Sequence, residues 1–161
     1  MMKKLSFALL LIVTLLLAAC SLDAPGSEKS DSKKGSSEGD YKIGLSVSTL
    51  NNPFFVTLSE GAEAKAKELG AKVTVVDAQD NASKQASDVE DLIQQGIDLI
   101  IINPVDSQAV ASSVESANAA NIPVVTVDRS SEGGEVVAHI ASDNAAGGEI
   151  AGEYLLEQHG K

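Results

Sequence analysis

A run of four residues, Asn52-Pro53-Phe54-Phe55, combines types that could hold a small polar ligand. Asparagine is a favoured N-cap of helices, and proline fits the first helical position because its missing N–H is not needed there. The two rings would then lie in the first helical turn, where their faces could pack on the CH-rich face of a pyranose or furanose ring. The alternative is an apolar start to a core helix, and Phe55 could belong to that core in part.

A second pair, Asp128-Arg129, offers complementary chemistry. Arg129 is the only arginine in the sequence. Its planar guanidinium has five N–H donors and the neighbouring carboxylate only accepts, so the pair could both donate to and accept from vicinal hydroxyls. A surface ion pair without function is the equally simple alternative.

The elements that must position these clusters alternate between strand and helix patterns after Tyr41. Strand patterns cover 42–47, 73–76, 99–102, 124–127 and 136–140, and helical spacing of apolar residues covers 53–69, 83–95, 107–120 and 145–158. The expected inward-facing residues of the first two helices are Phe55, Leu58, Ala62, Ala66, Leu69, Val89, Leu92 and Ile93. The unbroken apolar run 99–102 indicates a strand buried on both faces of a parallel sheet. We therefore predict an α/β fold, a doubly wound parallel sheet with right-handed crossovers.

Ligands of such sheets bind at the carboxyl ends of the strands, near the topological switch point. The residues that follow the predicted strands are polar: Ser48, Asn51, Asn52, Asp77, Asn103, Asp128, Arg129, Ser142 and Asp143. A water-exposed sheet edge would show some of this by chance. The order of the elements nevertheless predicts that both clusters lie along one edge of the sheet.

The first 19 residues have the pattern of an export signal. Lys3 and Lys4 give a positive start, and residues 5–19 are apolar apart from two hydroxyl side chains. A helix of that length spans about 22 Å, short of the ~30 Å hydrocarbon core of a bilayer. We therefore predict a signal peptide over 1–19 rather than a permanent membrane helix.

The signal ends in Leu17-Ala18-Ala19-Cys20, which resembles the lipobox of bacterial lipoprotein precursors. The resemblance implies that Cys20 becomes the first residue of the mature protein and carries a diacylglyceryl group, and two acyl chains suffice for stable anchoring. An ordinary secretory signal with a chance cysteine is the alternative. Because Cys20 is the only cysteine, the chain has no intramolecular disulfide and no Cys-based zinc site.

Residues 20–40 are rich in Ser, Gly, Lys, Asp and Glu and nearly free of apolar residues. Such a segment cannot bury enough apolar surface to offset its chain entropy, so it is predicted to be a disordered tether. The whole chain has 12 basic and 23 acidic residues and a net charge of −11. Nucleic acid is therefore not an expected partner, because its phosphates would be repelled.

From about Lys42 to its end, the chain resembles the amino-terminal part of the ribose-binding proteins. These are the solute-binding components of bacterial ABC importers, in the sugar-binding type I periplasmic binding-protein family. Four stretches carry the resemblance: 47–55 (VSTLNNPFF), 102–107 (INPVDS), 121–129 (NIPVVTVDR) and 139–144 (HIASDN). Together they are far more specific than any isolated short motif.

The resemblance implies a role for each site residue. Asn52 would hydrogen-bond a ribose hydroxyl, and Phe54 and Phe55 would sandwich one face of the sugar. Asp128 and Arg129 would hold hydroxyls with charge-assisted bonds. Two further residues would form the pocket wall and its support: Ser48 and Asn103. The implied partners are ribose and an ABC permease, with the protein a monomer held by Cys20 on the extracellular face of the cell membrane, without metal or cofactor.

Members of this family have two similar lobes that close over the ligand. The resemblance implies that 41–142 form the first lobe, that the chain leaves it near Ser142, and that 143–161 begin a second lobe that is cut short. The second lobe's contacts and the hinge strands would be missing. Because half of the hydrogen bonds and the exclusion of water would be absent, we expect weak ribose binding or none.

Other functions fit the sequence less well. An enzyme is not expected: no GxGxxG or P-loop follows the first strand, and His139 and His159 have no nucleophile arranged with them. A sugar-responsive transcription regulator would begin with a basic helix-turn-helix in place of an export signal. The segment 77–81 lacks the glycine and the distal glutamate of a calcium loop. A receptor for another monosaccharide or a furanosyl signal molecule remains the main alternative.

Overall fold

The computed structural model describes residues 41–160. The predicted signal peptide (1–19), the candidate lipidation site Cys20 and the predicted tether (20–40) lie outside the described residues. Within 41–160, no helix has the length and apolar character needed to cross a bilayer.

Five parallel strands form one sheet in the order β2-β1-β3-β4-β5. The strands are β1 (Lys42–Val47), β2 (Lys72–Asp77), β3 (Leu99–Ile102), β4 (Val124–Val127) and β5 (Ala138–Ile140). The chain moves outward from β1 to β2 and then turns back to β3, so the switch point lies between β1 and β3. This is the predicted doubly wound α/β fold.

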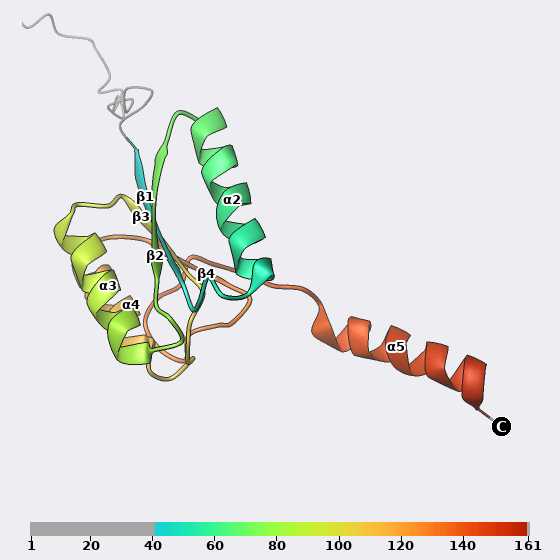
Figure 1. Cartoon of the computed structure of the whole chain (residues 1–161). Coiled ribbons are helices and arrows are strands. Elements are labelled where there is room, and N and C mark those ends of the chain that lie inside the picture. The colour runs from blue at the N-terminus through green and yellow to red at the C-terminus, as the bar shows by residue number, and fades with distance from the viewer. Residues whose placement is uncertain (1–40, 161) are drawn as a thin grey trace, which may run out of the picture. The chain divides into compact units, whose positions relative to one another are not determined.

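Helices cover the two faces of the sheet unequally (Figure 1). Helix α2 (Pro53–Glu68) lies on one face, and α3 (Ala82–Gln94) and α4 (Ala111–Ala119) lie side by side on the other. Reversing the direction of travel at constant crossover hand places α2 and α3 on opposite faces. Helix α5 (Asn144–His159) has no buried residue.

The main core lies between the sheet and the α3–α4 pair. Its fully buried members come from β3, β4 and both helices: Val89, Leu92, Ile100, Ile102, Val114, Ala117 and Val124. Gly44 in β1 allows close contact there, because a Cβ at that position would lie 2.9 Å from Leu92 Cδ1. This tight packing holds the strand ends in fixed relative positions.

Three expectations about the elements were wrong in part. Helix α4 begins at Ala111 rather than at 107, because the Asp106 carboxylate accepts the N–H groups of Gln108 and Ala109 and forms a separate turn. Strand β5 begins at Ala138 rather than at 136. Leu69 is the C-cap of α2 and is 67% exposed, so it does not face the core.

The expectation that β3 is buried on both faces was also wrong. Ile100 and Ile102 are buried under α3 and α4, but Leu99 and Ile101 on the opposite face are only half-buried. Helix α2 covers the sheet mainly over β2, so it leaves the neighbouring face of β3 partly open.

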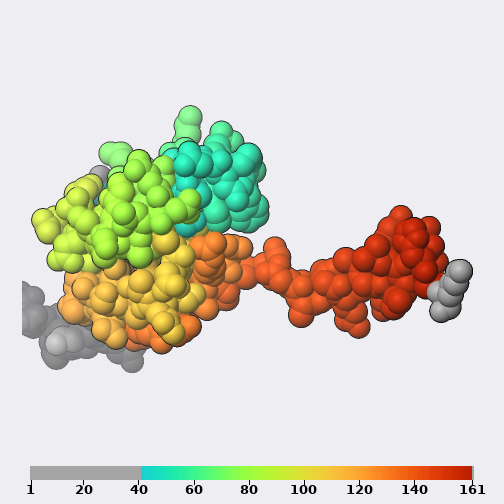
Figure 2. Space-filling model, turned by 60° about the horizontal axis from the view of Figure 1, so that its bottom comes forward, coloured from blue at the N-terminus to red at the C-terminus, as the bar shows by residue number. Residues whose placement is uncertain are grey.

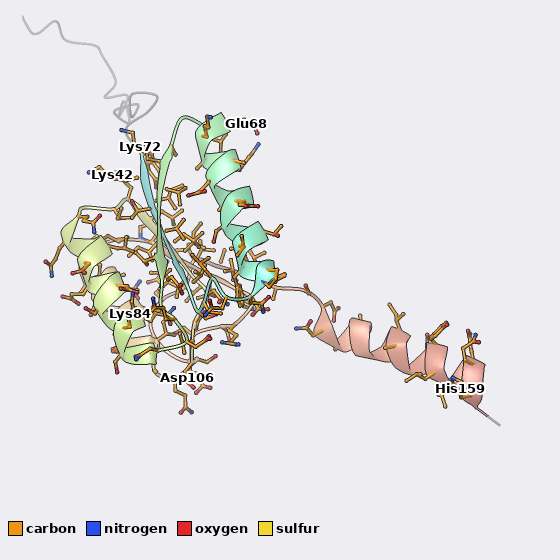
Figure 3. The ribbon with its side chains drawn as sticks, in the orientation of Figure 1. Lys42, Glu68, Lys72, Lys84, Asp106 and His159 are labelled. Carbon is orange, nitrogen blue, oxygen red and sulfur yellow. The ribbon has the colours of Figure 1, made fainter. Side chains whose placement is uncertain are left out.

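The two ends of the strands carry different residues. Lys42 and Lys72 begin β1 and β2 at one edge, whereas Asp106 and Lys84 lie at the opposite edge, where the strands end (Figure 3). Helix α2 starts at this second edge, directly after the loop that leaves β1. The edge where the strands end, called the carboxyl edge below, therefore collects the residues that the sequence singled out.

Candidate ligand-binding site

Asn103 joins the ends of three strands at the switch point. Its side-chain Oδ1 accepts the Ser48 N–H at 3.1 Å, and its Nδ2 donates to the Val127 carbonyl at 3.1 Å. The same Nδ2 lies 3.5 Å from the Asp128 carboxylate. Asn103 is fully buried, so these bonds fix the relative positions of the residues that follow β1 and β4.

Ser48 carries a hydroxyl that has no partner within the described residues. The residue is 1% exposed, and its Oγ makes no hydrogen bond there. A buried polar atom without a partner costs about 1–3 kcal/mol. Such an atom at the carboxyl edge is suited to meet a hydroxyl group or a water molecule.

Asn52 and Pro53 start helix α2 as predicted. The Asn52 Oδ1 accepts the Phe54 N–H at 3.0 Å, and Pro53 is the first helical residue. Because only the oxygen of the side-chain amide is used in this cap, its Nδ2 group keeps two N–H donors. Asn52 itself is exposed at the carboxyl edge.

The two phenylalanine rings do not form a parallel pair. Their centroids are 5.2 Å apart with an interplanar angle of 76°, an edge-to-face contact. Phe54 is 54% exposed, whereas Phe55 is 5% exposed and belongs to the core. Phe54 therefore presents the broader aromatic surface, and Phe55 meets it in an edge-to-face contact; that both rings sandwich a sugar stays a prediction.

Asp128 occupies a strained turn at the end of β4. Its φ is 63°, and the Arg129 N–H donates across it to the Val127 carbonyl at 2.7 Å. A three-residue turn with positive φ is rare, and aspartate tolerates this backbone better than most residues. The Asp128 N–H donates to the Ile140 carbonyl at 2.9 Å, which ties the turn to β5.

Arg129 does not pair with its neighbour. The ion pairs among the described residues join Lys65 to Glu68 and Lys84 to Asp88. The Arg129 Nη1 instead donates to the Pro104 carbonyl at 2.9 Å and to the Val105 carbonyl at 3.0 Å. The alternative of a simple surface ion pair with Asp128 is thus wrong. The arginine is anchored to the loop after β3.

A pocket of about 360 Å³ opens beside these turns. It is lined mainly by apolar residues, with an aspartate and a serine as polar members: Phe54, Leu58, Val127, Asp128, Ile140, Ala141 and Ser142. Figure 2 brings the carboxyl edge toward the viewer and shows the start of α2 bordering the segment around β5. The cavity is close to the lower limit of ordinary small-ligand pockets.

Of the predicted site residues, the pocket brings together Phe54 and Asp128; Ser142, where the chain was expected to leave the first lobe, lines it as well. The others lie around it without lining it: Asn52 and Phe55 on α2, Ser48 and Asn103 at the switch point, and Arg129 on the next loop. Whether each of these residues contacts a ligand stays a prediction.

Sequence reasoning missed Gln85. This residue of α3 is 2% exposed and bonds to three different places on the sheet side of the helix. Its spacing was the available signal, because Gln85 stands four and seven residues before Val89 and Leu92 on the same helical face. A buried glutamine on the apolar face of a helix is expected to hydrogen-bond to a polar group of the elements packed against that face.

Comparison with known proteins places the chain in one protein family. Residues 43–161 match the family described as periplasmic binding protein domain. The chain is 53% identical over 160 residues to the ribose import binding protein RbsB of Bacillus subtilis (strain 168), covering 99% of this chain and 52% of that protein. The chain thus spans about half the length of this curated relative.

Two solved structures show the same fold. An ABC transporter solute binding protein from Mycobacterium smegmatis, with bound glycerol, is 42% identical with a TM-score of 0.70, covering 73% of this chain and 41% of the other. A Caulobacter myo-inositol binding protein bound to myo-inositol is 36% identical with a TM-score of 0.69, covering 73% and 40%.

Proposed function

The chain belongs to the periplasmic binding protein family, and from this premise we propose that it supplies one lobe of an extracytoplasmic receptor that captures ribose for an ABC importer. The observation that carries the proposal is that Phe54 and Asp128 line one pocket at the carboxyl edge. An apolar ring beside a hydrogen-bond acceptor suits a sugar, which has a CH-rich face and hydroxyl groups around its rim. The identity of the sugar comes from the Bacillus relative.

Each residue has a distinct part in this proposal. The exposed face of Phe54 packs on the sugar ring, and Phe55 holds Phe54 in place by its edge-to-face contact. The Asp128 carboxylate accepts from sugar hydroxyls. Donors come from Asn52 Nδ2, which the helix cap leaves free, and from the guanidinium nitrogens of Arg129 other than Nη1. Ser48 and Asn103 support the pocket from the switch point.

The strained turn at Asp128 favours binding because it holds the carboxylate in place before a ligand arrives. A side chain that is already oriented loses little further conformational entropy when it binds. The bonds from Asn103 to the Val127 carbonyl and from Asp128 N–H to Ile140 keep the turn in this shape.

A receptor for another cyclic polyol is the second candidate. The bound myo-inositol of the Caulobacter structure has a ring of hydroxyl groups around a CH-rich face, as a pyranose does. The pocket around Phe54 and Asp128 could accept either shape, so the choice of ligand requires measurement.

The proposal also includes the cellular location. We place the mature protein on the extracellular face of the cell membrane, held by a lipid on Cys20 and tethered by residues 21–40, with the signal peptide removed and an ABC permease as partner. The lipobox-like sequence that ends at Cys20 supports the anchor. A lobe and its permease could then meet close to the membrane surface.

The test is a titration of the full chain with ribose, followed by the backbone amide signals of Phe54 and Asp128 in NMR spectra. We expect shifts confined to the carboxyl edge and an affinity in the millimolar range, because Phe54 is 54% exposed and water reaches the pocket from one side. Phe54→Ala should weaken binding about tenfold through the lost apolar contact.

Leu69→Ala is the matched control, because Leu69 is an exposed apolar residue at the other end of the same helix. It should bind ribose as the unchanged chain does. Tighter binding of myo-inositol than of ribose would favour the second candidate. No shift with either ligand would contradict the proposal that this lobe carries a ligand site by itself, and would agree with the other expectation from the sequence, that the chain does not bind ribose.

A further inference from the structure

The buried side chain of Gln85 holds both ends of a three-residue segment at the carboxyl edge. Its Nε2 donates to the Asn103 carbonyl at 2.9 Å, and its Oε1 accepts the Val105 N–H at 2.8 Å. The same Nε2 also donates to Ser46 Oγ in β1 at 3.1 Å. One amide therefore uses both of its donor hydrogens and its acceptor, and it joins α3 to β1 and to the loop after β3.

The segment that Gln85 holds, 103–105, is the anchor of Arg129. The two carbonyls that receive the Arg129 Nη1 belong to Pro104 and Val105, at 2.9 and 3.0 Å. A carbonyl direction depends on the peptide planes around it. Gln85 bonds to the peptide groups 103–104 and 104–105, and the second of these contains the Pro104 carbonyl. It therefore directly fixes the direction of one carbonyl that holds the guanidinium, and the Val105 carbonyl belongs to the next peptide group along the chain.

We propose that Gln85 is a positioning residue for the ligand: by holding segment 103–105 it sets the place of the Arg129 guanidinium. The proposal rests on the proposed function only in assigning Arg129 a ligand hydroxyl. Gln85 is 2% exposed and lies on α3, a helix that contributes no residue to the lining of the pocket. Its effect must therefore pass through the segment and Arg129.

The first measurement needs no ligand. Arg129 is the only arginine of the chain, so a nitrogen-15 labelled sample gives a single set of guanidinium signals. In the full chain we expect the Nη1 signal to be separate from Nη2, because two carbonyls hold Nη1. In Gln85→Leu, which keeps the bulk and removes the bonds, exchange between the two signals should be about tenfold faster.

Two further variants separate positioning from general destabilisation. Val89→Ala removes fully buried methyl groups one turn further along α3, without touching the segment. It should lower the stability and leave the guanidinium signals unchanged. Gln85→Glu keeps an acceptor for the Val105 N–H and should restore part of the separation between the signals.

The second measurement adds ribose. In the unchanged chain the Arg129 Nε signal should shift on titration, and in Gln85→Leu the apparent dissociation constant should rise about tenfold. In an Arg129→Lys background the same change at Gln85 should alter the affinity less than about twofold, because the residue through which it acts is gone.

The outcomes distinguish this proposal from the proposed function. Guanidinium signals in Gln85→Leu that equal those of the unchanged chain, or that change equally in Val89→Ala, would overturn the positioning role. If ribose shifts nothing in the unchanged chain, the proposed function fails, while the ligand-free comparison still decides the role of Gln85.

Discussion

The face of the sheet under α3 and α4 is closed, whereas the face under α2 is closed over β1 but partly open at β3 and β4. Ile100 and Val124 are fully buried on the closed face. Their strand neighbours Ile101 and Val125, which point to the opposite face, are only half-buried. The same two strands thus contribute one side chain to a dense core and the next to a surface beside the pocket.

This difference separates stability from binding. The closed face contains the main core and the buried bonds of Gln85, and Asn103 joins the ends of β1, β3 and β4 at the carboxyl edge. The open face carries Phe54 and Ile140, which line the pocket. A rigid support behind a partly exposed surface is an arrangement suited to holding ligand groups in place.

The largest expected effect compares two adjacent residues of β3. Ile100→Ala should lower the free energy of unfolding by about 3 kcal/mol, because it leaves a cavity in the closed core, and Ile101→Ala by about 1 kcal/mol. Urea denaturation of both variants measures the difference. Equal losses would mean that the two faces are covered to the same extent in solution.

A second variant tests the polar support at the carboxyl edge. Asn103→Leu should cost about 2 kcal/mol, because the Ser48 N–H loses its acceptor and the Val127 carbonyl loses a donor in a buried place. The same denaturation experiment measures this loss.

Asn51→Ala is the control for Asn103, since Asn51 is exposed in the nearby loop and should change the stability by less than about 0.5 kcal/mol. A loss at Asn103 no larger than this control value would show that the buried bonds do not hold the strand ends together.

The smallest expected effect compares two helix caps, one on each face. The Oδ1 atoms of Asn52 and Asn81 accept the N–H groups of Phe54 and Lys84, each at 3.0 Å. Asn52→Ala and Asn81→Ala should each cost about 1 kcal/mol. Only Asn52→Ala should also weaken ribose binding in a titration, since Asn52 stands next to Phe54 and keeps two Nδ2 donors for the ligand, whereas Asn81 starts α3, which contributes no residue to the pocket lining. A loss of binding in both variants would argue that the caps act through stability alone.

Much of the fold could be predicted from the sequence. The strands at 99–102 and 124–127 and the start of α2 at Pro53 were confirmed. Apolar runs and a local cap depend on neighbouring residues, so their signals lie within a short window. The predicted start of α4 was wrong because the turn at Asp106 has the same local sequence signals as a helix start.

The edge of the sheet that carries the candidate site was predictable, but the geometry of its residues was not. The polar ends of parallel strands had to meet at one edge, and the sequence named Phe54 and Asp128 there. It placed Phe55 among the inward-facing residues, which the structure confirms, but it did not reveal that Arg129 bonds to the Pro104 carbonyl rather than to Asp128. The bond of Arg129 depends on contacts between residues far apart in the chain.

The sequence by itself determined the order of strands and helices, the cap at Asn52 and the edge at which the polar residues gather, because these follow from periodicity and local hydrogen bonding. Only the tertiary structure decided that one face of the sheet is closed and the other partly open, and that Gln85 stands behind Arg129. Burial and long-range hydrogen bonds depend on which elements lie beside each other, and no short stretch of residues carries that information.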